Sequence, residues 1–122
     1  MGSRYSEKFT EHFLEPRNRG RMENPTGVGV MGTPGLGPYL VFQIAIVGTR
    51  VEQARFQCHN CGVTVACGSA LTELVKNKSL DDCCQITEKV LCNALDGVPQ
   101  DKMHVPTFVL GALKLAIGDV SK

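Results

Sequence analysis

The sequence has no tryptophan, few aromatic residues and no block of like charge. Aromatic side chains make up 6% of the 122 residues, and 13 Lys and Arg against 12 Asp and Glu give a formal net charge of +1. Neither sign gathers into a long run, so we expect no surface built for nucleic acid or for an anionic membrane. The charge pattern therefore argues against both classes of partner.

Two kinds of hydrophobic segment are also missing. No uninterrupted apolar stretch approaches the ~20 residues that a membrane-spanning helix needs. The opening residues, MGSRYSEKF, contain no hydrophobic core of the kind found in a signal peptide. We therefore expect a cytoplasmic protein. A hydrophobic share of 43% in 122 residues suits one compact domain over residues 1–122.

Six cysteines are present, which would be enough for a disulfide framework in a secreted protein. However, Cys83 and Cys84 are adjacent, and four of the six cysteines lie in helical patterns, where the geometry of a bridge is hard to satisfy. Reduced thiols are the better interpretation. Cys83, Cys84 and Cys92 share helical faces with leucine and alanine, so we expect them to pack in the core.

Hydrophobic periodicity predicts an α+β domain in which a small three-stranded antiparallel sheet packs against about four to five helices. On the last strand, Val51, Phe56 and either Ala54 or Arg55 compete for the inner face. The expected elements are a helix over 5–14, a glycine-rich edge strand and loop over 27–37, a hairpin over 39–47 and 50–58, a helix over 62–76, short helices capped by Ser79 and Thr87, and a last helix from near Pro106.

Four segments resemble one known family. They are YSEKFTEHFLEPRNRG at 5–20, GTPGLG at 32–37, NCGVTVACGSALTELVKNKSLDD at 60–82 and VPQDKMHV at 98–105. Their order and spacing match the IscU/NifU N-terminal type of iron-sulfur cluster assembly scaffold, within the SufE/NifU superfamily, so the chain is identified as a divergent member. The resemblance implies the IscU/NifU-like fold, a role as scaffold or carrier rather than enzyme, iron or other metal binding, and docking to a cysteine desulfurase.

The ligand set that the resemblance implies is mostly absent. The family places one cysteine in each of three loops, and these positions fall on Leu36, Cys61 and Val105. Its aspartate falls on Pro38 and its histidine on His104. Leucine and valine have no donor atom, and proline has no side-chain oxygen. Only Cys61 and His104 therefore remain as cofactor-binding and metal-binding candidates.

The segment that resembles the family's chaperone-recognition motif is altered as well. Pro99 and Lys102 match the motif, but Gln100 and Asp101 stand where it has proline and valine. The resemblance therefore does not carry chaperone docking over to this chain.

A second interpretation rebuilds the metal site from other residues. Cys58 and Cys61 have the spacing of a metal knuckle, and Cys67 with His59 or His104 would complete four nitrogen and sulfur ligands, the usual count for zinc or a small iron-sulfur cluster. Alternatively, Cys58 only ends a strand and Cys67 packs as a small hydrophobe on an apolar helical stripe. Both interpretations stay open at this point.

No enzymatic or nucleotide-binding arrangement is indicated. The glycine-rich loop lacks the Gly-Lys-Ser/Thr ending of a phosphate cradle, and no Ser-His-Asp or paired-carboxylate motif is present. Three hypotheses follow. In the first, the chain is an assembly protein that holds iron, zinc or a cluster, alone or as a dimer sharing Cys61 and His104. In the second, it is a cluster-free interaction protein that docks to a cysteine desulfurase or another partner and regulates it. In the third, it carries persulfide on Cys61.

Overall fold

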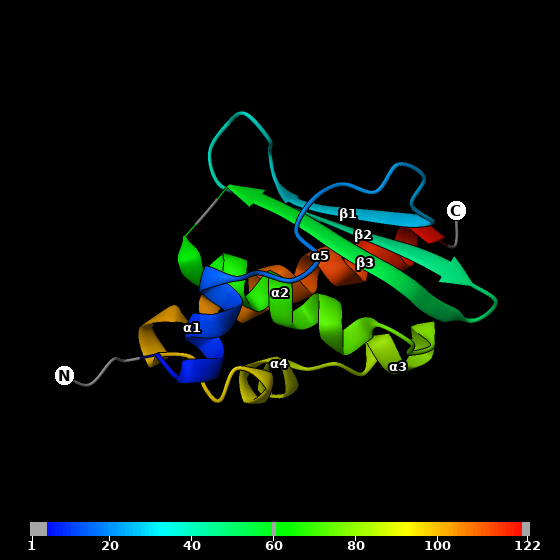
Figure 1. The fold of residues 1–122 in the computed structure, drawn as a ribbon. Helices are drawn as coiled ribbons and strands as arrows, with labels where there is room; N and C mark the ends of the chain where they lie inside the picture. The colour runs from blue at the N-terminus through cyan, green and yellow to red at the C-terminus, as the bar shows by residue number, and fades with distance from the viewer. Residues whose placement is uncertain (1–4, 60, 121–122) are drawn as a thin grey trace.

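The computed structural model, which describes residues 5–59 and 61–120, places its helices on one face of a three-stranded sheet (Figure 1). The strands are antiparallel in the order β1-β2-β3. The α+β class predicted from the sequence is confirmed. In chain order the elements are α1 (Glu7–Leu14), β1 (Gly27–Gly32), β2 (Tyr39–Val47), β3 (Arg50–His59), α2 (Gly62–Val75), α3 (Leu80–Cys84), α4 (Glu88–Ala94), the 3-10 turn η1 (Gln100–Lys102) and α5 (His104–Val120).

The inner face of the sheet forms the base of the core, and a β-bulge decides which residues of β3 contribute to it. Ala45 pairs with Gln53 whereas Ile46 pairs with Val51, so β3 carries one extra residue at this point. The bulge allows Val51 and Ala54, three positions apart, both to be buried. Ala54 therefore takes the inner position, and Arg55 stays partly exposed.

Helix α5 approaches β1 closely because the inner face of β1 carries glycine. A Cβ added at Gly29 would lie 1.9 Å from the carbonyl oxygen of Ala112, and one at Gly27 would lie 2.3 Å from that of Ala116. No side chain fits in these positions. The two glycines thus set the distance between the sheet and the longest helix.

The segment Gln100–Val120 corrects one expectation from the sequence. Its 21 residues are long and apolar enough to cross a membrane by length and composition, although no such stretch was expected. In the fold this segment packs against the sheet, and Val109, Ala112 and Ala116 are buried in the core. A helix that packs in the core of a folded domain passes the same test of length and composition. This segment is therefore only weak support for a membrane span.

Both edges of the sheet are partly covered. The N–H of Val28 on β1 donates a hydrogen bond to the Asp119 carboxylate on α5 at 3.0 Å. At the other edge, the N–H of Gly20 donates to the carbonyl of Phe56 at 2.8 Å. These contacts occupy backbone groups that would otherwise be open to pairing with another strand.

The helix signals in the second half of the chain are confirmed, with one exception among the cysteines. Ser79 and Thr87 accept hydrogen bonds from backbone N–H groups as helix caps, and α5 begins at His104. Cys83 is buried, with 2% of its surface exposed, and Cys92 is also buried. Cys84 is exposed, so its predicted place in the core is wrong: α3 is one short turn and buries only one of two adjacent side chains.

Candidate functional site

Cys61 is the N-cap residue of α2, at the junction between the last strand and the helix that follows it. Its side chain is exposed, and its Sγ lies 3.7 Å from the hydroxyl oxygen of Thr64. Partial burial acts to raise the pKa of Cys61, but the backbone N–H and hydroxyl of Thr64, the N–H of Val63 and the charge of Lys102 together lower the pKa below its ordinary value of 9.0. The thiolate is therefore stabilised at a helix N-terminus.

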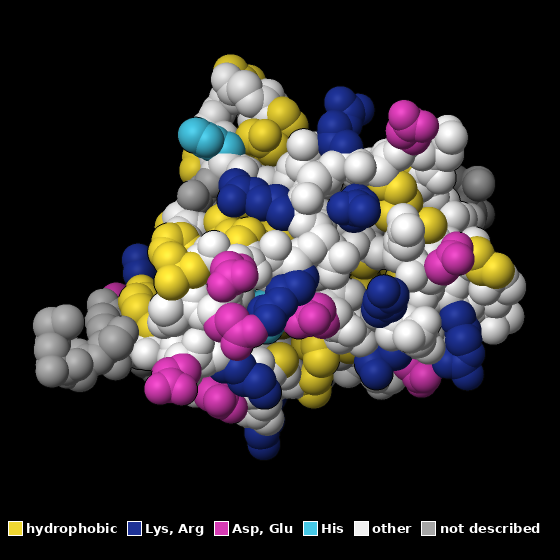
Figure 2. Space-filling view, in the orientation of Figure 1, with side chains coloured by type: hydrophobic (Ala, Val, Ile, Leu, Met, Phe, Trp, Pro, Cys, Tyr) yellow, Lys and Arg dark blue, Asp and Glu magenta, His cyan; other side chains and the backbone are white. Residues whose placement is uncertain are grey.

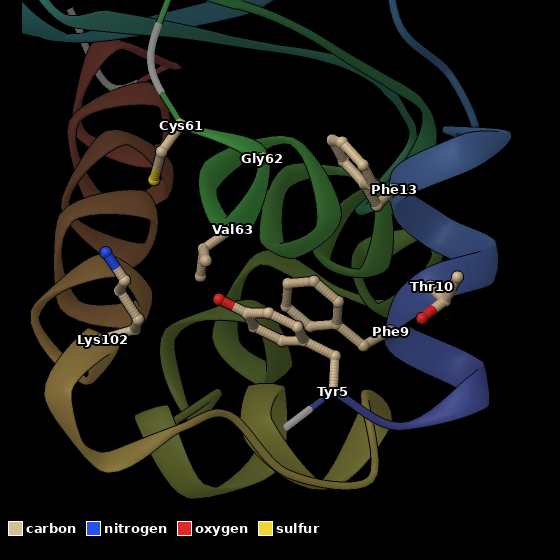
Figure 3. Close-up of a pocket in the computed structure, with 8 residues that line it drawn as sticks. All are labelled: Tyr5, Phe9, Thr10, Phe13, Cys61, Gly62, Val63 and Lys102. Atoms are coloured by element: carbon tan, nitrogen blue, oxygen red, sulfur yellow. The ribbon is translucent and has the colours of Figure 1, made fainter. Parts of the chain in front are cut away.

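The thiol lines an apolar pocket of about 270 Å³. One wall comes from α1 and the residues just before it, where the rings of Tyr5 and Phe9 stack with their centroids 4.4 Å apart. The other wall comes from the start of α2 and from Lys102 of η1, whose amine points toward the sulfur of Cys61 (Figure 3). Residues from three separate stretches of the chain thus meet around one thiol.

Phe13 covers the start of α2 because the first helical residue is glycine. A Cβ added at Gly62 would lie 2.6 Å from the Phe13 ring, so a side chain at this position would displace the ring. Phe13 nevertheless keeps 45% of its surface exposed. The ring therefore forms an apolar rim beside Cys61, with one side open to solvent.

His104, the second site residue predicted from the sequence, is exposed at the first position of α5. Val105, which occupies the family's third cysteine position, has 3% of its surface exposed and packs in the core. Leu36, in the first cysteine position, is 83% exposed in the loop between β1 and β2, and Pro38 in the aspartate position is also exposed. The replaced positions therefore differ sharply in exposure.

The other predicted metal ligands do not form a metal-holding group with Cys61 among the described residues. Within residues 5–59 and 61–120, no three or more His, Cys, Asp and Glu side chains form a group that could hold a metal ion. Cys67 has no exposed surface, and burial raises the pKa of its thiol far above the ordinary range. The structure favours the packing interpretation of Cys67. Cys58 is half-buried on β3, and His59 is exposed beside Tyr39.

A buried polar network fixes α1 to α2 below the pocket. The N–H of Arg17 donates to the hydroxyl oxygen of Ser69 at 2.8 Å, and His12 Nδ1 lies 2.7 Å from the same oxygen. The Arg17 guanidinium, which can only donate, lies 3.4 Å from the same Nδ1, so Nδ1 of a neutral His12 is the acceptor and the Ser69 hydroxyl donates to it. Burial lowers the pKa of His12, as does the charge of Arg17, while Glu73 opposes the shift. His12 is thus a structural histidine.

Lys102 and the aromatic residues Tyr5, Phe9 and Phe13 belong to the site, although the sequence did not predict them there. The signals were present: Tyr5, Phe9 and Phe13 recur at helical spacing, and Lys102 lies in the segment at 98–105 that resembles the family motif.

On the face shown in Figure 2, Lys and Arg side chains lie among Asp and Glu, and hydrophobic side chains are visible toward the end that carries the β1-β2 loop. Among the described residues, this surface has no concentration of one charge, whereas the site is an apolar pocket with one thiol, Cys61, and one amine, Lys102.

Comparison with known proteins identifies the family of the chain. Residues 4–122 match the family model of the NifU-like N-terminal domain. The iron-sulfur cluster assembly scaffold protein IscU of Aquifex aeolicus is 37% identical over 121 residues, which cover 98% of this chain and 77% of that protein. IscU of Escherichia coli strain K12 is 36% identical over 119 residues, covering 94% of this chain and 92% of that protein.

Solved structures show the same fold at lower identity. A NifU-like N-terminal protein from Brucella abortus superposes with a TM-score of 0.75 at 10% identity, covering 95% of this chain and 93% of that one. A putative iron-sulfur cluster assembly scaffold for the SUF system from Fervidobacterium islandicum AW-1 gives 0.72 at 16% identity, covering 93% and 96%. The match along the chain and the identities to IscU proteins show that this chain belongs to the NifU-like N-terminal domain family.

Proposed function

We propose that this chain acts in iron-sulfur cluster assembly as a non-enzymatic carrier or scaffold, with Cys61 as the residue that receives sulfur or iron. Relatives that match most of the chain are named as iron-sulfur cluster assembly scaffold proteins. The observation that carries the proposal for this chain is the Cys61 thiol, exposed at a helix N-terminus with a lowered pKa. A thiolate is the form that binds soft metals and attacks sulfane sulfur.

The surroundings of Cys61 suit a charged ligand or adduct. Lys102 faces the sulfur (Figure 3), so its amine would stabilise a thiolate, a persulfide anion or an anionic cluster. His104 follows Lys102 by two residues and is exposed, which makes its imidazole available as a second donor. A cysteine desulfurase is the expected source of sulfur, by family resemblance, and the cytoplasm is the expected compartment.

Two donors do not complete a cluster site. A [2Fe-2S] unit takes about four protein donors, usually thiolates, and Cys67 is enclosed in the core. A stable cluster therefore requires donors from a partner or from a second copy of the chain. For this reason we place receipt of sulfur or iron at Cys61 before storage of a complete cluster.

A second candidate function is cluster-free docking to an assembly partner. Its support is exposed apolar surface: Leu36, which occupies a ligand position of the family, is 83% exposed at the loop, and Phe13 and Leu14 are exposed on α1. Such side chains suit contact with another protein. This candidate predicts that binding of a cysteine desulfurase survives the change Cys61→Ala.

The two candidate functions are distinguished by the metal and sulfide content of the purified protein. Iron, zinc and acid-labile sulfide would be measured after purification without oxygen for the native chain and for Cys61→Ala, His104→Ala and Cys84→Ala, the last an exposed cysteine on α3 that serves as the control. Metal, or a sulfur adduct after treatment with a desulfurase and cysteine, that disappears in Cys61→Ala and persists in Cys84→Ala supports the carrier. A chain that takes up neither and still binds the desulfurase supports docking.

A further inference from the structure

Cys58 lies near the end of the last strand, three residues before Cys61 in the sequence. It pairs with Leu40 across β2 and β3 and packs half-buried against the core. Strand β3 ends at His59, and Cys61 directly precedes α2. The strand end and the helix start therefore bring the two cysteines of a Cys-x-x-Cys sequence to one end of the sheet. This spacing is the one used by dithiol redox sites.

The two thiols differ in exposure and in acidity. Cys61 is exposed with a lowered pKa. Burial raises the pKa of Cys58, and the negative charge of Cys61 raises it further, whereas Arg19 acts in the opposite direction. Arg19 is held beside β3 by its bridge to Phe56. The difference in exposure, with an exposed thiol three residues after a half-buried one, suits a pair in which the first reacts with the outside and the second resolves the product.

The remaining cysteines are badly placed for this role. Cys67, Cys83 and Cys92 are buried, at 0%, 2% and 8% exposure. Cys84 is exposed but belongs to α3, beyond the far end of α2 from Cys61 (Figure 1). All six cysteines lie in the described residues, and none is in a disulfide. Cys58 is therefore the thiol best placed to react with an adduct on Cys61.

We propose that Cys58 is the resolving thiol of Cys61: when Cys61 carries a persulfide, Cys58 displaces the outer sulfur as sulfide and closes a Cys58–Cys61 disulfide. This inference rests on the proposed function, because sulfur must first reach Cys61. Resolution would require the Cys61 side chain to turn away from Lys102, toward which its sulfur points (Figure 3).

The step balances without another reactant. The Cys58 thiolate attacks the inner sulfur, which is bonded to the Cβ of Cys61. The bond between the inner and outer sulfur atoms breaks, and its electron pair leaves with the outer sulfur as hydrosulfide. The outer sulfur gains two electrons, which the two cysteine sulfurs supply as they form the disulfide. The chain would thus release sulfur in the oxidation state in which it enters an iron-sulfur cluster, and an external thiol would restore the dithiol afterwards.

The test loads sulfur and then follows its release. The reduced full-length chain is treated without oxygen with inorganic polysulfide, freed of excess reagent, and followed by intact mass, by peptide mapping of disulfides and by evolved sulfide. We expect the native chain to lose the added sulfur, release one sulfide per chain and lose two hydrogens in a Cys58–Cys61 disulfide. Cys58→Ser and Cys58→Ala should keep the persulfide on Cys61 and release sulfide about tenfold more slowly or worse. Cys84→Ser should behave like the native chain.

Each contrary outcome has a distinct meaning. A native chain that keeps its persulfide as long as folded Cys58→Ser does, or that forms its disulfide with another cysteine, overturns the role of Cys58 and leaves Cys61 as the acceptor. A Cys58→Ser chain that never gains sulfur on Cys61 overturns sulfur receipt at Cys61, and resolution by Cys58 with it. Circular dichroism of each variant checks that the fold is retained, and two substitutions at Cys58 guard against an effect of one side chain.

Discussion

The Nδ1 atom of His12 on α1 lies 2.7 Å from the hydroxyl oxygen of Ser69 on α2, a buried contact between residues 57 positions apart. The same oxygen accepts the N–H of Arg17, so one hydroxyl joins a helix, the turn after it and the helix that starts at Cys61. The pocket lies between these two helices, and its shape therefore depends on this network.

The free energy of unfolding should fall as the pH drops below 6.5, the ordinary pKa of a histidine. The reason is that burial and the Arg17 charge lower the pKa of His12 in the folded protein. The unfolded chain then binds a proton that the folded chain resists, so the stabilisation is complete above 6.5 and is lost progressively as the pH falls through the folded pKa. The Glu73 carboxylate, 3.6 Å from Nε2, and the charge of Glu11 reduce this shift, whereas the charge of Lys8 adds to it. Urea unfolding at pH 7.5, 6.5 and 5.5 would measure it. His12→Gln should be less stable at pH 7.5 with a flatter profile, and equal slopes in the two proteins would exclude His12 as the cause.

Gly29→Ala should destabilise the fold by about 3 kcal/mol, because overpacking of this kind forces backbone to move. The added Cβ would meet the carbonyl oxygen of Ala112 at 1.9 Å, and α5 would have to shift away from β1. Gly118→Ala is the control, since a Cβ there meets nothing within 4 Å, and alanine in a helix is favoured by about 0.5–1 kcal/mol. Thermal unfolding compares the two. Equal melting temperatures would show that α5 does not lie as close to β1 as described.

Cys61 should react with iodoacetamide at lower pH than an ordinary thiol with a pKa of 9.0, because its pKa is lowered. Lys102→Met should raise this pKa and slow alkylation a few-fold at pH 7, since a nearby positive charge favours the thiolate. Peptide mass spectrometry would give the rate at each cysteine as a function of pH. Lys114→Met, at an exposed position of α5, should leave the rate unchanged. An identical pH profile in Lys102→Met would show that Lys102 does not lower the pKa of Cys61.

Asp119→Ala should weaken the edge of the sheet, because the carboxylate accepts the Val28 N–H at 3.0 Å. Loss of a hydrogen bond to a charged group costs about 1.5–3 kcal/mol, and the uncovered edge becomes open to pairing with other chains. Hydrogen exchange at the Val28 amide and light scattering at raised concentration would measure the two effects. Asp119→Asn keeps an acceptor oxygen and should fall between the native chain and Asp119→Ala. Unchanged exchange at Val28 in Asp119→Ala would contradict the capping role.

The sequence by itself determined the order of the elements, because local patterns report local backbone structure. The strands at 39–47 and 50–58 were predicted within one residue of β2 and β3, since β-branched runs flank a turn in which Gly48 has a φ of +66°. Ser79 and Thr87 marked helix starts for the same reason: a cap acts within three residues. Family membership also followed from sequence, through motifs spread along the chain.

Only the tertiary structure decided which thiols are accessible and what faces them. Cys61 and Cys67 belong to the same strand-to-helix segment, yet one is exposed and the other is enclosed. Lys102, 41 positions further along the chain, points toward Cys61 in the fold (Figure 3). The bulge opposite Ala45 and Ile46 places Ala54 rather than Arg55 in the core. Periodicity indicates which face of an element is apolar, but exposure, pKa and pocket shape depend on segments that are distant in sequence and meet only when the chain is folded.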